Sequence, residues 1–527
     1  MTHDPALPSL EFGQSRTLRL GVALAALLSV SVARAEEPKR AGEPSVMREP
    51  AEITQVADAF DGDDLFDLIL TLGYESSWKQ AEIRRESSIA QTGLSNGGFV
   101  ADNMNVAKFR ESTSRLNTRA DIGLFRDVAL YLRMPIILSN EQELTSLNGS
   151  AGQQSVVLEG APGEQLFSLP FKSPKRSGIE YLAIGVDAAI MSQGRDHTKP
   201  TWVFGLEGRF NVSDPRRACN ANPARLNAFD PATDSQPTLR CADPSDVNRN
   251  GVSGERSPNP PLDGAVVEGT FTSGNRSPGV SRGTTALELH TYVSRRIKYI
   301  EPYGGFRALF EFQNSSSDYG QSDLKGSLVN HPPLRGTVLF GLNVIPWEIR
   351  DQFQRVTLDF RFAGTYVSEG RDYSELFDAL GSSDAPTLRM PNYASYRNVM
   401  LASQNQSVVD AESNKVYFTG ITDVQAHGDY KLSASFTFQA GAYVKFNLGA
   451  AYGITQGHFI TFDQACNPNF TGDLGAAGSC KTGGEGQQAA TGIPNPNFRK
   501  GINDTGRRFR VDNSSNIDAW LNASVMF

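Results

Sequence analysis

The chain contains no long hydrophobic run. Its longest apolar stretch, residues 20–32, has 13 residues, whereas a membrane-spanning helix needs about 20. The mean hydropathy is also low, at −0.34. Any membrane-spanning part of this protein must therefore be built from β-strands, the other way to satisfy every backbone hydrogen bond inside a bilayer.

An excess of basic charge is also absent. The 50 lysines and arginines are outnumbered by 58 aspartates and glutamates, which gives a net charge of −8. A nucleic-acid-binding protein presents a basic face to the phosphate backbone. The composition therefore excludes nucleic acid as a partner.

Cysteine is scarce, with only four residues: Cys219, Cys241, Cys466 and Cys480. They form neither a zinc-binding spacing nor a CxxC redox motif, so we expect no metal and no cofactor. Of the three possible connectivities, the local disulfides Cys219–Cys241 and Cys466–Cys480 are the simplest. In an oxidising compartment each would stabilise a loop by roughly 3 kcal/mol in the chain-entropy model.

One segment resembles the start of a calcium loop. Residues 246–251, Asp-Val-Asn-Arg-Asn-Gly, place oxygen ligands at alternate positions before a glycine. Ser257 stands where such a loop has its glutamate. A solvated loop is therefore the favoured interpretation, and we predict no metal site.

The first 35 residues have the pattern of a secretory signal peptide. Arg16 and Arg19 precede the apolar stretch 20–32, and residues 33–35, Ala-Arg-Ala, supply a cleavage pattern of small residues. We therefore expect residues 1–35 to be removed on export.

The C-terminal residues 517–527 alternate between apolar and polar side chains, as a strand between lipid and a polar lumen does. The pattern resembles the terminal strand of Gram-negative outer-membrane β-barrels, in which a final aromatic residue is read by the assembly machinery. This resemblance implies that Phe527 contacts that machinery and that lipid surrounds the strand. An edge strand of a soluble β-sandwich is the alternative. The apolar face consists of Ile517, Ala519, Leu521, Ala523, Val525 and Phe527.

The same alternation recurs along the chain and predicts twelve strands. Pro135 is unfavourable inside the third of them, because proline cannot donate to a strand ladder. The strands lie near residues 65–78, 116–124, 128–138, 182–190, 202–210, 287–293, 304–312, 338–344, 356–366, 432–438, 444–454 and 517–527.

The connections between these strands alternate between long and short without exception. Outer-membrane barrels have long outer loops, short periplasmic turns and an even strand number, whereas a soluble sandwich has no reason to separate the two sets. We therefore expect an all-β fold, a closed antiparallel transmembrane β-barrel of about 12 strands over residues 64–527. Residues 36–63 would form a periplasmic N-terminal segment, and both termini would be periplasmic. The long connections fall near 88–111, 140–176, 213–282, 313–334, 368–418 and 463–507, and the short ones near 125, 195, 297, 349 and 440.

Residues 372–381 predict a helix within one long loop. The segment has a capping candidate, apolar i, i+3, i+4 spacing and a terminal glycine. It would fold over or into the barrel mouth, or lie on the surface.

The inward-facing positions of the predicted strands carry charges of both signs. Ten acids and nine bases occupy them, so an open pore should have weak charge selectivity. Opposite charges two residues apart also predict a salt-bridge network, and a lumen filled by such a network is the alternative. The predicted pore-lining residues are Arg115, Arg119, Asp121, Arg133, Asp187, Glu207, Arg209, Glu288, His290, Arg307, Glu311, Asp359, Arg361, Lys431 and Lys445.

These features favour a passive outer-membrane pore for small hydrophilic solutes. Glu288 and His290 share a face and could form an acid/base pair, but a histidine in a polar network is the simpler interpretation, so we predict no enzyme. One alternative is a structural or interaction barrel whose large loops bind a partner. Another resembles the long-chain fatty-acid transporter barrels, with residues 36–63 entering the lumen as a small hatch. The sequence does not predict the oligomeric state.

Overall fold

The computed structural model describes residues 51–61, 64–90, 99–147, 158, 165–221, 240–241, 277–314, 317–319, 326–383, 385–389, 418–468, 481–482, 489–490 and 493–527. Within these ranges, no helix is long and apolar enough to cross a membrane. The predicted signal peptide (residues 1–35), the calcium-loop resemblance (246–251) and Cys480 lie outside the described residues.

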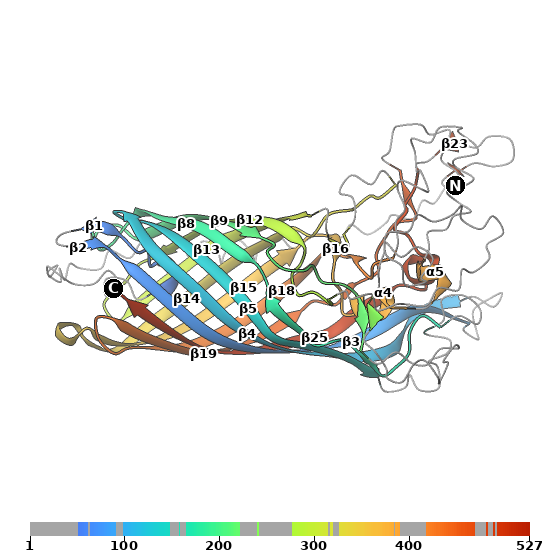
Figure 1. The fold of residues 1–527 in the computed structure, drawn as a ribbon, viewed down its shortest axis with the longest axis horizontal. Helices are drawn as coiled ribbons and strands as arrows, with labels where there is room; N and C mark the ends of the chain where they lie inside the picture. The colour runs from blue at the N-terminus through green and yellow to red at the C-terminus, as the bar shows by residue number, and fades with distance from the viewer. Residues whose placement is uncertain are drawn as a thin grey trace, which may run out of the picture. The chain divides into compact units, whose positions relative to one another are not determined.

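Twelve long strands pair antiparallel in one closed ring (Figure 1). The ring closes at β25, which pairs with β19 on one side and with β3 on the other. This closure excludes an edge strand of a sandwich and confirms the predicted 12-strand barrel. The barrel strands are β3 (Leu68–Ala90), β4 (Phe99–Phe125), β5 (Val128–Ser146), β8 (Leu182–Met191), β9 (Thr201–Phe210), β12 (Thr284–Ser294), β13 (Ile300–Gln313), β14 (Arg335–Ile349), β15 (Gln354–Val367), β18 (His427–Gln439), β19 (Val444–Thr455) and β25 (Phe509–Met526).

Large apolar side chains cover the outer face of the barrel. Leu72, Leu432 and Leu448 each expose more than half of their surface, and their neighbours along each strand point inward. So many exposed apolar side chains are unfavourable against water but are typical of a wall that faces lipid. The outer face therefore fits a membrane.

The wall of the barrel is uneven in height. β3 and β4 contain 23 and 27 residues, whereas β8 and β9 contain 10 each, about the length that crosses a bilayer. A bulge between Asp512 and Ser515 of β25, with Asn513 at φ 48°, turns Val511 and Phe509 to the buried side. The tall wall formed by β25, β3, β4 and β5 therefore has an apolar inner face at its end.

Pro135 is tolerated because of a gap in the neighbouring strand. β5 pairs with β8 up to Arg133 and then with the short β7 (Arg176–Ile179). Between these two strands the Glu180 amide donates to the carbonyl of Pro135 at 2.9 Å. The proline thus supplies its acceptor at a place where the regular ladder is interrupted.

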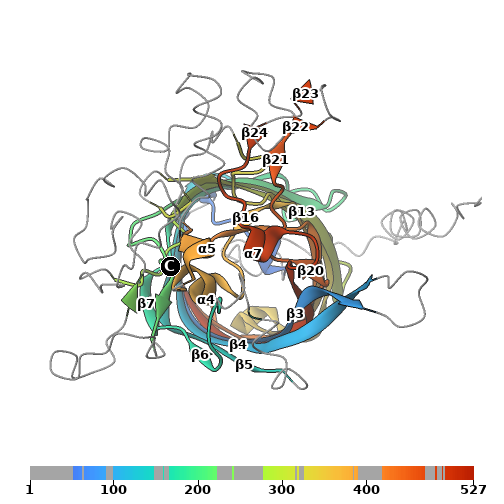
Figure 2. The ribbon, with the colours of Figure 1, turned by 90° about the vertical axis from the view of Figure 1, so that its right-hand side faces the viewer.

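Loop segments cross the long-loop end of the barrel, where Figure 2 shows α4 (Phe377–Gly381), α5 (Pro386–Arg389) and α7 (Lys500–Asn503) over the opening. The predicted helix at 372–381 is confirmed in its second half, since residues up to Asp372 instead form β16 (Gly370–Asp372) with β17 (Thr422–Val424). All of α4 is buried, so it lies in the mouth. The remaining elements are η1 (Glu52–Thr54), β1 (Ala59–Asp61), β2 (Asp64–Phe66), β6 (Phe171–Lys172), β10 (Cys219–Asn220), β11 (Arg240–Cys241), η2 (Arg350–Gln352), β20 (His458–Phe459), β21 (Cys466–Asn467), β22 (Lys481–Thr482), β23 (Ala489–Ala490) and β24 (Ile493–Pro494).

Candidate functional site

The candidate site is the middle of the barrel interior, which we call the waist. All fifteen predicted pore-lining residues occupy inward positions, because each alternates with an outward apolar neighbour in the ladder. Glu311 lies at the mouth, and Lys445 lies at the short-turn end. The other thirteen residues line the waist.

One charged network joins β4, β8 and β12 across the waist. The Arg119 guanidinium donates to both oxygens of Asp121 at 2.6–2.9 Å and to Asp187 at 3.3 Å. Nε2 of His290 lies 2.8 Å from the other oxygen of Asp187. The histidine is therefore held by a carboxylate within a polar network, as the simpler interpretation of its position predicts.

A second network lies beside the first, on β5, β9 and β12. Glu207 accepts hydrogen bonds from Arg133 and from Nε of Arg209, the latter at 2.6 Å, and Arg209 also pairs with Glu288. The ring of Tyr181 lies 5.5 and 5.2 Å from the two guanidinium carbons. Each buried carboxylate in this part of the wall thus has a basic partner.

The opposite side of the waist carries isolated pairs. Arg361 donates to Asp359 at 3.0 Å and to the hydroxyl of Tyr303 at 2.8 Å. Lys431 on β18 pairs with Asp518 on β25 at 2.6 Å. Charged groups therefore surround the whole waist.

The basic side chains of the waist keep part of their surface exposed. The side chains of Arg119, Arg133 and Lys431 are 36%, 30% and 47% exposed. Outward positions face the membrane, so this exposed surface belongs to the lumen. A lumen packed completely with salt bridges would bury these side chains, so their exposure favours a waist that side chains do not fill.

The mouth contains a different kind of structure, which we call the mouth plug. Loop residues around α4, α5 and α7 pack against the apolar inner face of the tall wall. This buried cluster resembles the core of a soluble domain, so the plug folds by apolar burial. Its wall residues include Ala81, Ile83, Ala107, Phe109, Leu144, Phe509 and Val511, and its loop residues include Leu376, Leu380, Leu388, Phe418, Ile460 and Ile502.

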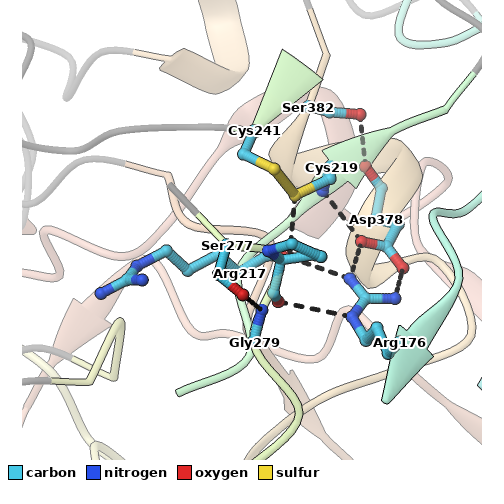
Figure 3. Close-up of a disulfide and its surroundings, with 9 residues drawn as sticks. Arg176, Arg217, Cys219, Cys241, Ser277, Gly279, Asp378 and Ser382 are labelled. Atoms are coloured by element: carbon cyan, nitrogen blue, oxygen red, sulfur yellow. Dashed lines mark hydrogen bonds and ion pairs between the residues drawn. A yellow bond between two sulfur atoms is a disulfide. The ribbon is translucent and has the colours of Figure 1, made fainter. Parts of the chain in front are cut away.

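A buried ion pair anchors α4 to the wall (Figure 3). The Arg176 guanidinium donates to the two oxygens of Asp378 at 2.9 and 2.6 Å, and both side chains are almost completely buried. The amide of Cys219 donates to the same carboxylate at 2.9 Å, and Cys219 forms a disulfide with Cys241. The first predicted disulfide is thus confirmed. Cys466 is also disulfide-bonded.

A polar layer lies beneath the plug. Arg282 bridges Glu311 and Asp372, with N–O distances of 2.8 Å to each, and Arg335 pairs with Asp372 at 2.8 Å. Burial opposes ionisation of Asp372, but the two guanidinium groups outweigh it and lower its pKa below the usual value. This layer joins the plug to the strands that end below it.

A pair of buried acids lies on another side of the plug. Burial raises the pKa of Asp423 well above its usual value, and the nearby carboxylates of Asp463 and Glu369 raise it further, whereas Arg371 acts in the opposite direction. Burial also raises the pKa of Asp463. One oxygen of Asp423 has no hydrogen-bond partner in the described part of the chain.

Residues 51–58 enter the barrel at the short-turn end, and we call them the N-terminal insert. The amide of Ala51 donates to the inward carboxylate of Glu301 at 2.9 Å. Lys445 lies 3.4 Å from the carboxylate of Glu52. Of the segment predicted to precede the barrel, this part is therefore held against the inner wall.

Sequence reasoning located the charges of the waist but missed the anchors of the plug. Arg176 and Asp378 are 202 positions apart, and a loop arginine that will be buried has no local signature. The apolar inner face of the tall wall could have been suspected, because alternation continues beyond residue 78 through Ala81 and Ile83.

In comparisons with known proteins, no family model and no curated protein sequence matches this chain. Solved structures match it over most of its length. One is an outer membrane channel from Pseudomonas putida F1, with 8% identity, coverage of 87% of this chain and 95% of that chain, and a TM-score of 0.27. A second is a FadL homologue from Pseudomonas aeruginosa, with 9% identity, coverage of 87% of this chain and 90% of that chain, and a TM-score of 0.29. A third is a mutant of the TodX monoaromatic hydrocarbon channel, with 10% identity, coverage of 92% of this chain and 94% of that chain, and a TM-score of 0.31. Likeness at this level concerns the fold alone. The closed ring of 12 antiparallel strands and its apolar outer face give this chain the architecture of Gram-negative outer-membrane β-barrel proteins.

Proposed function

We propose that this protein is an outer-membrane channel for small hydrophilic solutes, with a solvated waist between two narrowed ends. The mouth plug would narrow the outer end, and the N-terminal insert would narrow the periplasmic end. With the plug at the outer end, the short turns and both termini face the periplasm, as in other outer-membrane barrels.

The exposure of the basic side chains in the waist carries this proposal. Lys431 and Arg119 keep about half and a third of their side-chain surface exposed on the inner side of the barrel. Charged groups lose several kcal/mol when they leave water, so an interior built only for stability would exclude water from these pairs or replace them with apolar packing. A solvated charged waist instead suits the passage of hydrated solutes.

A channel for hydrophobic compounds is the second candidate. Two observations favour it: the N-terminal insert lies in the lumen, as expected of a hatch in fatty-acid transporter barrels, and the mouth contains a large apolar cluster. TodX, one of the similar structures, is described as a monoaromatic hydrocarbon channel. The charges of the waist oppose this candidate, since an apolar solute would have to displace their water.

Solute uptake by proteoliposomes tests the proposal. Vesicles that contain the folded protein should swell in isotonic arabinose and much less in a bulky trisaccharide, and removal of residues 51–58 should speed the swelling. Vesicles with heat-denatured protein serve as the control. Uptake of toluene without uptake of arabinose would favour the second candidate. A folded barrel that admits neither would favour an interaction barrel.

A further inference from the structure

In most arginine and lysine ion pairs of the waist, the basic side chain is more exposed than its acidic partner. The side chain of Arg133 is 30% exposed, whereas its partner Glu207 is 3% exposed. The same order holds for Lys431 at 47% and Asp518 at 7%. Although the waist contains similar numbers of acids and bases, the surface that a passing solute meets is therefore mainly basic.

Arg307 adds a basic group that has no acidic partner. It points inward from β13 between His290 and Thr337 in the ladder. Among the described residues, no hydrogen bond or ion pair joins its guanidinium to a carboxylate, and its charge acts on the phenol of Tyr292. The charge of Arg307 is therefore available to a solute in the lumen.

Two acidic side chains, Glu52 and Glu75, also keep exposed surface on the inner side of the barrel. Glu52 is 40% exposed at the short-turn end, where it pairs with Lys445. Glu75 is 26% exposed; it forms an ion pair with Arg115 and accepts a hydrogen bond from the side-chain amide of Asn117. Neither acid lies beside Arg307 in the ladder, so neither cancels its field there.

The field along the lumen depends on which charge lies closer to the axis. A pair whose positive end points inward acts as a dipole that attracts anions, even though its net charge is zero. The low-dielectric wall of a narrow lumen concentrates such fields, and salt screens them only beyond about 8 Å at physiological ionic strength. Equal counts of acids and bases in the sequence thus do not determine the selectivity.

We infer that the waist selects small anions, such as chloride and short carboxylates, and that Arg307 is a selectivity-determining residue. This inference rests on the proposed channel function and adds the class of solute. It replaces the weak selectivity expected from the charge count.

The reversal potential of the channel in planar bilayers tests this inference. In a gradient of potassium chloride, the unmodified protein should show an anion preference. Arg307→Gln should lower the anion-to-cation permeability ratio by about twofold, because one nearby charge within the screening length changes the local ion concentration by a factor of that order. Arg307→Lys should keep the preference, and Lys298→Gln, on an exposed short turn, should leave it unchanged.

The outcomes separate the inference from the function on which it rests. A conducting channel that prefers cations, or one whose ratio is the same with Arg307→Gln, overturns the anion preference and leaves the channel in place. A folded barrel without any conductance overturns both. Since no salt bridge joins Arg307 to a described residue, its replacement should not prevent folding, and resistance of the folded band to heating on a gel checks this.

Discussion

The mouth plug and the waist both contain arginine–carboxylate pairs, but the pairs are buried in the plug and partly exposed in the waist. Arg176 in the mouth is completely buried with Asp378, whereas Arg119 in the waist is 36% exposed beside Asp121. A buried pair is costly to break, because removal of one partner leaves an unpaired charge without water. A solvated pair contributes little to stability. The same chemistry therefore anchors a helix in one region and lines a lumen in the other.

Replacement of the buried acid should have the largest effect. Asp378→Asn leaves Arg176 buried without a counter-charge, so the mouth plug should lose about 3–5 kcal/mol of stability. Hydrogen exchange of residues 372–383 should become faster, while the heat resistance of the barrel should change little. Unaltered exchange in the plug would show that this pair does not anchor α4.

Loss of the disulfide should have a smaller effect in the same region. Cys219 and Cys241 are 22 positions apart, and a crosslink that closes a loop of this size contributes roughly 3 kcal/mol in the chain-entropy model. The double variant Cys219→Ser/Cys241→Ser should therefore loosen the segment around β10, as measured by limited proteolysis with and without reductant. Reductant should have no further effect on the double variant at this site. Equal proteolysis of both proteins would contradict this contribution.

The stability of the mouth plug should also depend on pH. Because burial and neighbouring acids raise the pKa of Asp423 in the folded protein, its protonated form stabilises the plug near and below about pH 4, the usual aspartate range. That stabilisation is lost as the pH rises through the raised folded pKa. Hydrogen exchange of residues 418–425 should accelerate with increasing pH beyond the intrinsic chemical rate.

Asp423→Asn is the matched control for this pH effect. An amide stays neutral, so the variant should lose most of the extra acceleration, which for one proton is at most about 1.4 kcal/mol per pH unit. If the variant and the unmodified protein showed the same pH profile, another group would be responsible.

Removal of a waist charge should have the smallest effect on stability. Arg361 is 31% exposed beside Asp359, so Arg361→Gln should change stability by no more than about 1 kcal/mol. The unfolding midpoint in urea should remain close to that of the unmodified barrel. A loss as large as that of Asp378→Asn would mean that the waist is a packed structural core.

The sequence predicted the barrel well because its information is local. Period-two alternation and the lengths of connections depend on neighbouring residues, so β8, with Ile184 and Val186 outward, was located within one residue. β3 extends twelve residues past its predicted end, because its later apolar positions contact the plug instead of lipid.

The candidate site was predictable in part. Inward positions such as Arg119 and Glu207 follow from strand period alone. Their partners across strands, such as Asp187 for Arg119, depend on register and strand order, which a single sequence does not specify. The relative exposure of acids and bases depends on how far each side chain reaches into the lumen. The roles of Phe527 in assembly and of the charged residues in transport stay predictions.

Single-channel recording in planar bilayers tests the central claim, that a solvated waist is controlled by a buried plug. The unmodified protein should conduct with brief openings, and Asp378→Asn should raise the open probability, whereas Arg361→Gln should leave it unchanged. The account would be contradicted if the folded unmodified protein and Asp378→Asn were both silent, because release of the plug would then have opened no aqueous path.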